Sequence, residues 1–124
     1  MRVATINGSV YRIQFVHSAH DAKNPVEGLP GSLRQIVDNL ATSLRRRVTL
    51  CEIGQEGAGL AYDPTTGTHV PGVVVMPLAY GFSVCHYFDQ FVKAEGRSRS
   101  FHRALKNSKL DKGTREELLL ALGL

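Results

Sequence analysis

The chain has 124 residues, 43% of them hydrophobic, with a formal net charge of +4 and a pI near 9.3. This length predicts a single domain, residues 1–124, with a core that needs neither metal nor disulfide support. No apolar run approaches the roughly 18 residues that span a bilayer, and the N-terminal residues alternate instead of forming a signal-peptide block. We therefore expect a cytoplasmic protein without a membrane partner, whose two cysteines, Cys51 and Cys85, are free thiols in apolar surroundings.

The N-terminal residues predict a β-hairpin. Arg2 to Ile6 and Ser9 to His17 have the composition of strands, and Asn7-Gly8 between them accepts the positive φ angles of a type I′ turn. The polar segment that follows, residues 18–31, contains prolines and glycines typical of a loop.

A first helix is predicted from Ser32 to about Arg46. Ser32 is suited to cap it, and Arg45 to Arg47 suit the negative end of its dipole. These arginines either end the helix in solvent or form the edge of an anion site. The apolar residues that share one helical face are Leu33, Ile36, Val37, Leu40 and Leu44.

The next part of the chain predicts further hairpins. A glycine-containing turn at Gly54–Gly59 and a turn at Pro64–Gly67 separate the strands. Val73 to Met76 is continuously apolar, which is typical of a strand covered on both faces, and Pro77 ends this strand or places it beside an edge. The expected strands are Val48–Ile53, Ala58–Asp63, Thr68–Met76 and Leu78–Cys85.

The segment Phe82–Leu105 predicts a second main helix, starting at Asp89, whose carboxylate is suited to cap the first turn. Lys93, Arg97 and Ser100 lie on the flank of its apolar face, with Arg103 and Arg99 further round. Gly96 costs about 1 kcal/mol relative to Ala in a helix, which suggests close approach of a ligand or of another backbone. The small and apolar residues on the predicted buried face are Phe91, Ala94, Ser98, Phe101 and Leu105.

A short terminal helix is predicted at Thr114–Leu122, with a start close to a capping box. Its leucines face more than one side, so we expect it to dock on the domain's own core or on a second subunit. Together these elements predict an α+β fold: an antiparallel β-sheet built from hairpins, with two main α-helices and a short C-terminal helix.

No catalytic set emerges from the sequence. His17 and His20 lack an acidic or cysteine partner that would complete a metal site. Gly54, Gly57 and Gly59 lack the lysine and helix of a phosphate-binding loop. The serines near residue 100 have no base at a defined spacing. We therefore expect a binding protein rather than an enzyme, with no catalytic residue, metal or cofactor.

The cationic flank of the second main helix is suited to bind phosphate, because arginine's planar fork can donate two parallel hydrogen bonds. Tyr80, Phe82 and Tyr87 lie nearby in sequence and could offer a stacking face for a base. The alternative is that the arginines form a solvated helix face and that the aromatic residues belong to the core.

This segment resembles a motif of small phage and mobile-element proteins, Cys-x-x-x-Asp-x-Phe-x-Arg/Lys-x-x-Gly-Arg-x-x-Ala-x-x-Arg-Ala-Leu. It is similar to the motif of the phage-encoded Thoeris anti-defence sponge proteins. The corresponding residues, with Ser100 in place of the family's alanine, are Cys85, Asp89, Phe91, Lys93, Gly96, Arg97, Ser100, Arg103, Ala104 and Leu105. The chain departs from the pattern at Ser100 and His102, where the family's residues are usually smaller and more apolar, and its N-terminal part does not align.

The resemblance implies a phage or mobile-element counter-defence protein in the cytoplasm of an infected bacterial host. Such a protein would bind and sequester a cyclic nucleotide immune signal, a cyclic ADP-ribose isomer, as a homo-oligomer and without catalysis. It implies Arg97 and Arg103 as phosphate or ribose contacts and Asp89 as a helix cap or nucleotide contact. Lys93 joins this ligand-binding set, and Phe82, just upstream of the motif, is the candidate for base stacking.

Two alternatives remain open. A small basic nucleic-acid-binding regulatory protein would use the basic helix along a duplex. Glu95 among its cations, the modest net charge and the lack of an evident helix-turn-helix partner make nucleic acid a less favoured partner. An inhibitor that contacts a host defence protein directly is compatible with the same sequence.

Overall fold

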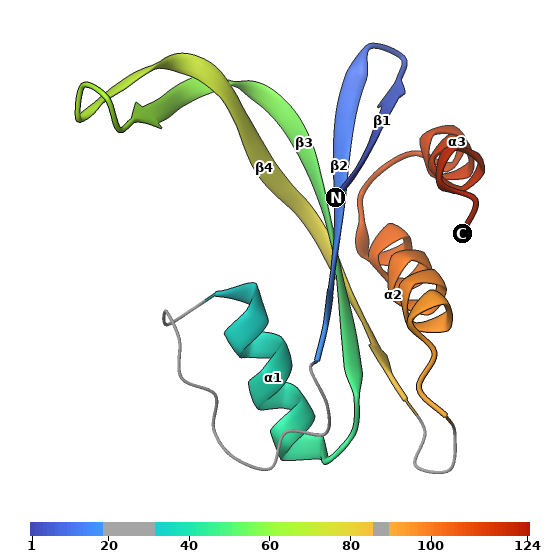
Figure 1. The fold of residues 1–124 in the computed structure, drawn as a ribbon. Coiled ribbons are helices and arrows are strands. Elements are labelled where there is room, and N and C mark those ends of the chain that lie inside the picture. The colour runs from blue at the N-terminus through green and yellow to red at the C-terminus, as the bar shows by residue number, and fades with distance from the viewer. Residues whose placement is uncertain (19–31, 86–89) are drawn as a thin grey trace.

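The computed structural model describes residues 1–18, 32–85 and 90–124. The four strands form one antiparallel sheet in the order β1-β2-β3-β4, with α1 on one face and α2 and α3 on the other (Figure 1). This arrangement confirms the predicted α+β class. The elements are β1 Arg2–Ile6, β2 Ser9–His17, α1 Leu33–Leu44, β3 Val48–Asp63, β4 Thr68–Val84, α2 Lys93–Asn107 and α3 Lys112–Leu122.

The N-terminal hairpin and the first helix are confirmed. Asn7 and Gly8 both have positive φ angles, 50° and 83°, as a type I′ turn requires. The Ser32 hydroxyl accepts a hydrogen bond from the Gln35 amide at 3.2 Å and so caps α1. The helix ends at Leu44, two residues before the predicted end, because Arg45 adopts a left-handed conformation with a φ of 53°.

The glycine-rich turn predicted at Gly54–Gly59 is wrong, because β3 runs through it without interruption. The glycines make room for valines on the neighbouring strand. A Cβ at Gly54 would lie 2.6 Å from Val75 Cγ1, and a Cβ at Gly59 would lie 2.8 Å from Val74 Cγ2. Here glycine reflects a close side-chain approach within the sheet rather than a turn.

The end of β4 predicted at Pro77 is also wrong. β4 continues from Thr68 to Val84, and Leu78 forms a bulge, since Gly54 pairs with Pro77 while Ile53 pairs with Ala79. As an edge strand, β4 tolerates proline, because a proline nitrogen can face the free edge. The turn predicted at Pro64–Gly67 is confirmed, with a positive φ of 68° at Gly67.

Val73–Met76 was predicted to be covered on both faces, and this prediction is wrong for the single chain. Val73 is 63% exposed and Met76 is 56% exposed. Beyond the residues that pair with β2, β3 and β4 continue as a two-stranded ribbon that projects away from all three helices (Figure 1).

The sheet has a hydrophobic cluster on each face. On one face, Ile13 and Ile53 of the sheet pack with Phe101 of α2 and Leu118 of α3. The cluster on the α1 face contains Val37, Ala41, Val48 and Leu50, with Phe82 packed against it. Of the two free cysteines, Cys51 is buried and Cys85 is half-buried.

The helix α2 begins at Lys93, later than predicted, and Asp89 lies outside the described residues. Its buried face also differs, because Ala94 is exposed and Ser98 is only partly buried. A row of small residues lets the helix axis approach the sheet closely. The residues that α2 buries are Gly96, Ser100, Phe101, Ala104 and Leu105.

The terminal helix α3 begins at Lys112 and is capped by Asp111, not by the predicted capping box at Thr114. The Asp111 carboxylate accepts hydrogen bonds from the amide and the hydroxyl of Thr114. Leu118 is fully buried in the domain's own core, whereas Leu120 is 84% exposed. In the part of the chain that the structure describes, no helix has both the length and the apolar character to cross a membrane.

Two glycines set the distance between α2 and the sheet. A Cβ at Gly81 of β4 would overlap the backbone of Ser100 and Ala104, and a Cβ at Gly96 of α2 would overlap the Thr49 side chain. The close approach that the sequence indicated at Gly96 is therefore made to strand β3.

We expect Gly81→Ala to lower the free energy of unfolding by about 3 kcal/mol, because the added methyl group meets helix backbone that cannot rotate away. Denaturant unfolding at fixed protein concentration measures this change. Gly57→Ala is the matched control, since its methyl would meet only Met76 Cε, at 4.0 Å. Similar unfolding midpoints for the two variants would contradict the proposed packing constraint.

Candidate anion-binding site

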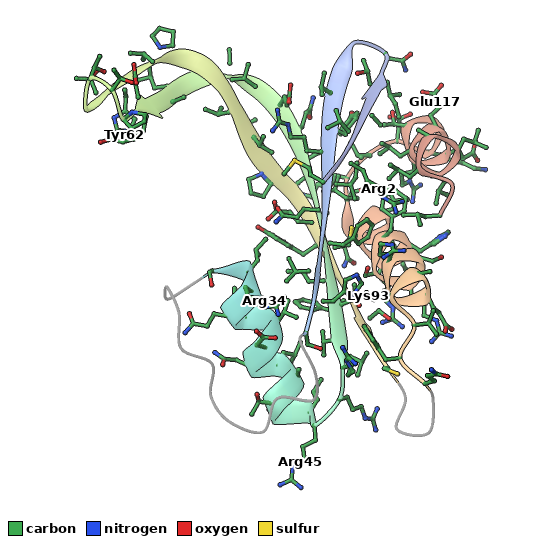
Figure 2. The ribbon with its side chains drawn as sticks, in the orientation of Figure 1. Arg2, Arg34, Arg45, Tyr62, Lys93 and Glu117 are labelled. Atoms are coloured by element: carbon green, nitrogen blue, oxygen red, sulfur yellow. The ribbon has the colours of Figure 1, made fainter. Side chains whose placement is uncertain are left out.

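A cleft of about 430 Å³ lies at the end of the sheet, where β2 finishes and β3 begins. Because β1 pairs with β2 only as far as Ile13, the last residues of β2 have no strand on their outer side. Arg34 on α1 and Lys93 at the start of α2 are labelled in Figure 2, where the two helices flank the sheet. The described residues that line the cleft are Phe15, Val16, His17, Ser18, Arg34, Arg47 and Lys93.

His17 lies at the centre of the positive charge around this cleft. Burial, and then the charges of nearby arginines and a lysine, lower the pKa of His17 from 6.5 to about 4. Its Nδ1 lies 2.8 Å from the Thr49 hydroxyl, and its ring meets the ring of Phe91 edge-on, with centroids 5.9 Å apart. The imidazole is therefore neutral near pH 7. The cations that act on it are Arg97, Lys93, Arg47 and Arg34.

Arg34 is held in place from both sides of its guanidinium. Its Nε lies 3.0 Å from Asp38 Oδ2, one helical turn away, and its Nη1 donates to the His17 carbonyl at 2.9 Å. Asp38 is only 4% exposed. These contacts fix α1 against the end of β2 and orient one arginine at the mouth of the cleft.

Arg47 is positioned by an aromatic ring. Its guanidinium carbon lies 4.2 Å from the centroid of Phe91, a cation–π contact. The Arg47 Nη2 donates to the Ser18 carbonyl at 3.4 Å, and the Arg47 carbonyl accepts from the Cys85 amide at 2.9 Å. Phe91 thus holds both Arg47 and His17, which join the region before β3 to the approach to α2.

Lys93 and Arg97 complete the cationic group from the first turns of α2. Neither lies within 4.0 Å of a carboxylate among the described residues. The Arg97 Nε is buried and has no hydrogen-bond acceptor in the described part of the chain. The positive end of the α2 dipole adds to their charge, since Val92 at the N-cap provides no side-chain cap.

Of the five ligand-binding residues predicted from the sequence, Lys93 lines this cleft, and Arg97 lies near enough to His17 to lower its pKa, although it does not line the cleft. Arg103 lies further along α2, where its Nη1 donates to the Phe82 carbonyl at 2.6 Å. The Phe82 side chain packs in the core on the α1 face, opposite α2. Phe82 is therefore not placed to stack on a base beside Arg97, and Asp89 lies outside the described residues.

The sequence reasoning did not single out His17, Arg34 or Phe91 as site residues. The sequence placed His17 at the end of a strand and without the partners of a metal site, and it placed Phe91 on a buried face and in the motif of the second main helix. Arg47 belonged to the arginine triplet for which an anion-binding edge was one of two interpretations. Phe91 belongs to that motif, but no local pattern joins it to His17 or Arg34, because the cleft forms only when β2, α1 and α2 meet.

Cys51 is unsuited to nucleophilic chemistry or metal binding, because burial raises its pKa to about 12. Within residues 1–18, 32–85 and 90–124, no group of three or more His, Cys, Asp or Glu side chains is arranged to hold a metal ion. Comparisons of the chain with protein-family models, with curated proteins and with solved structures found no significant match.

We expect NMR titration to show that the His17 ring remains neutral until the pH falls to about 4. Arg97→Ala should raise this pKa toward 6.5, because it removes the largest of the charge effects on the ring. Arg99→Ala is the matched control, since Arg99 is on the same helix but is exposed and paired with Glu95. Equal His17 pKa values in both variants would contradict the assigned electrostatics.

The same shift links His17 to acid stability. The unfolded chain binds this proton near pH 6.5 and the folded chain near pH 4. Between these values the unfolded state holds more protons, so His17 lowers stability as the pH falls. Arg97→Ala should weaken this part of the acid destabilisation.

Proposed function

We propose that the protein binds a small phosphate-bearing ligand of nucleotide type in this cleft and holds it without catalysis. The observation that carries the proposal is the convergence of four cations around one neutral histidine. They come from α1, from the residue before β3 and from α2, and they are Arg34, Arg47, Lys93 and Arg97. Like charges held together at one cleft are stabilised when an anion binds between them.

The contacts of each cation suggest how the four side chains share the binding of a ligand. Arg34 is already paired with Asp38 and Arg47 lies on Phe91, so both are oriented before a ligand arrives. Lys93 and Arg97 have no carboxylate partner among the described residues, which leaves their charge available to a phosphate. A charge-assisted hydrogen bond of this kind contributes about 1.5–3 kcal/mol.

His17 and the neighbouring aromatic residues suit the rest of such a ligand. A neutral imidazole can donate or accept a hydrogen bond, depending on its tautomer, and so can meet a hydroxyl or a phosphate oxygen. Phe15 lines the cleft and offers apolar surface in place of Phe82. The cleft volume of about 430 Å³ lies within the range of small-molecule sites.

The narrower form of the proposal is that the ligand is a cyclic ADP-ribose isomer and that the protein sequesters it. This form is supported by the resemblance of the segment from Cys85 to Leu105 to the anti-defence sponge motif. Two residues of that motif, Lys93 and Arg97, belong to the group of cations around His17. The diphosphate of such a ligand matches a group of several cations better than a single phosphate would. The proposed setting is the cytoplasm of an infected bacterial cell.

We expect isothermal titration with inorganic pyrophosphate, ADP and cyclic ADP-ribose isomers to detect binding of at least one of these ligands. Lys93→Ala and Arg97→Ala should each weaken it by about tenfold or more, the equivalent of one lost charge-assisted hydrogen bond. Arg99→Ala should bind as the wild type does, because Arg99 is paired with Glu95 outside the cleft. Full affinity in the Lys93 and Arg97 variants would contradict the assignment of these two residues to ligand binding.

Denaturing the complex and identifying the released ligand then separates the possible activities. An intact ligand supports sequestration, whereas an altered product would indicate an enzyme. Lack of uptake of every nucleotide, together with salt-sensitive retention of DNA, would favour the nucleic-acid-binding alternative.

A further inference from the structure

We propose that the β3–β4 ribbon, residues 56–76, is a self-association surface whose two faces are covered by a second copy of this chain. β2 pairs with β3 only up to Gln55, so within the described residues the ribbon has two strands and no helix over it (Figure 1). A two-stranded hairpin is marginally stable in water without further packing. The ribbon therefore needs a cover that the single chain does not supply.

Exposed apolar side chains are concentrated on the ribbon. It contributes six of the fourteen exposed large hydrophobic side chains among the described residues, although it is about a sixth of the chain. Figure 2 labels Tyr62 near its tip. The six are Leu60, Tyr62, Val70, Val73, Val75 and Met76.

These side chains lie on both faces of the ribbon. The register places Leu60 opposite Pro71 and Ala58 opposite Val73, so Leu60 and Val73 share one face with Tyr62 and Val75. Val70 and Met76 lie on the other face. A partner that covered only one face would leave apolar surface exposed on the other.

Charge favours a second copy over an acidic or nucleic-acid partner. No lysine or arginine occurs between Val48 and Val84, although the whole chain carries a charge of +4. Glu56 is paired with Arg12 of β2, which leaves Asp63 as the other carboxylate of the ribbon. An acidic partner would therefore have no lysine or arginine of the ribbon to bind. Two nearly neutral apolar ribbons do not repel each other.

The prolines of β4 indicate that the contact uses the faces of the ribbon and not the free edge of β4. Pro71 and Pro77 have no N–H group, so they interrupt the row of donors that a new strand would pair with. Edge-to-edge pairing through β4 is therefore interrupted at Pro71 and at Pro77.

The area also requires both faces. Eight residues per strand span about 27 Å, and two strands are about 10 Å wide, so one face covers about 270 Å². One face from each of two copies gives about 540 Å², which is less than the roughly 1,000 Å² of a specific interface. Two faces from each copy give about 1,080 Å², which reaches it.

Light scattering coupled to size-exclusion chromatography tests the proposal. At about 100 µM the wild type should have at least twice the chain mass of 13.6 kDa. The double variant Leu60→Lys, Val73→Lys should elute as a 13.6 kDa monomer, because it places charge on side chains that are 64% and 63% exposed in the single chain. A wild type that is monomeric, or a variant that remains oligomeric, would overturn the proposal.

Leu120→Lys on α3 is the matched control, because Leu120 is 84% exposed and lies far along the chain from the ribbon. It should remain oligomeric, and a monomeric Leu120→Lys variant beside an oligomeric ribbon variant would place the contact on α3 instead.

If the ribbon variant fails to fold, hydrogen exchange of the wild type tests whether the ribbon is the contact surface. Ribbon amides should become at least tenfold more protected as concentration rises, and unchanged protection would refute the contact. Nucleotide binding is measured separately, so its failure leaves this result unaffected.

Discussion

The structure depends on the close contact between α2 and strands β3 and β4. Gly81 lies directly under the helix backbone, and Gly96 of the helix lies over Thr49. This contact buries Phe101 and Leu105 against the sheet and fixes where α2 begins. Because Lys93 and Arg97 lie in its first turns, the same packing that builds the core carries these two cations to the end of the sheet.

The second consequence of this geometry is electrostatic. Thr49, which packs against Gly96, also lies 2.8 Å from the ring of His17. Phe91, just before α2, contacts both His17 and Arg47. The histidine is thus partly buried among cations, and its burial, followed by their positive charge, lowers its pKa. A cluster of like charges is costly without a counter-ion, and we propose an anionic ligand in that role.

Much of the fold could be predicted from the sequence, because local chemistry decides turns and caps. Asn7-Gly8 and Ser32 behave as predicted. The glycines of β3 were misread, because a glycine that admits a valine from the neighbouring strand looks the same in sequence as a glycine in a turn. The apolar run at Val73–Met76 was misread as a strand covered on both faces, because an apolar run does not show whether other parts of the same chain pack on it.

The candidate site was predictable only in part. Helical spacing placed Lys93 and Arg97 together, since they lie four residues apart on one helix. It could not place Phe82, whose side chain points to the opposite face of the sheet. Nor could it join His17 and Arg34 to them, because that requires knowing where β2 ends relative to both helices. Contributions from distant parts of the chain become visible only in the folded structure.

The most direct measurement is the NMR signal of the His17 imidazole as pyrophosphate is added at pH 7 and then titrated with acid. An anion bound among Arg34, Arg47, Lys93 and Arg97 should shift this signal and raise the His17 pKa from about 4 toward 6.5, because it offsets the surrounding positive charge. A His17 signal and pKa that do not change, at concentrations where calorimetry detects pyrophosphate binding, would mean that the anion binds elsewhere.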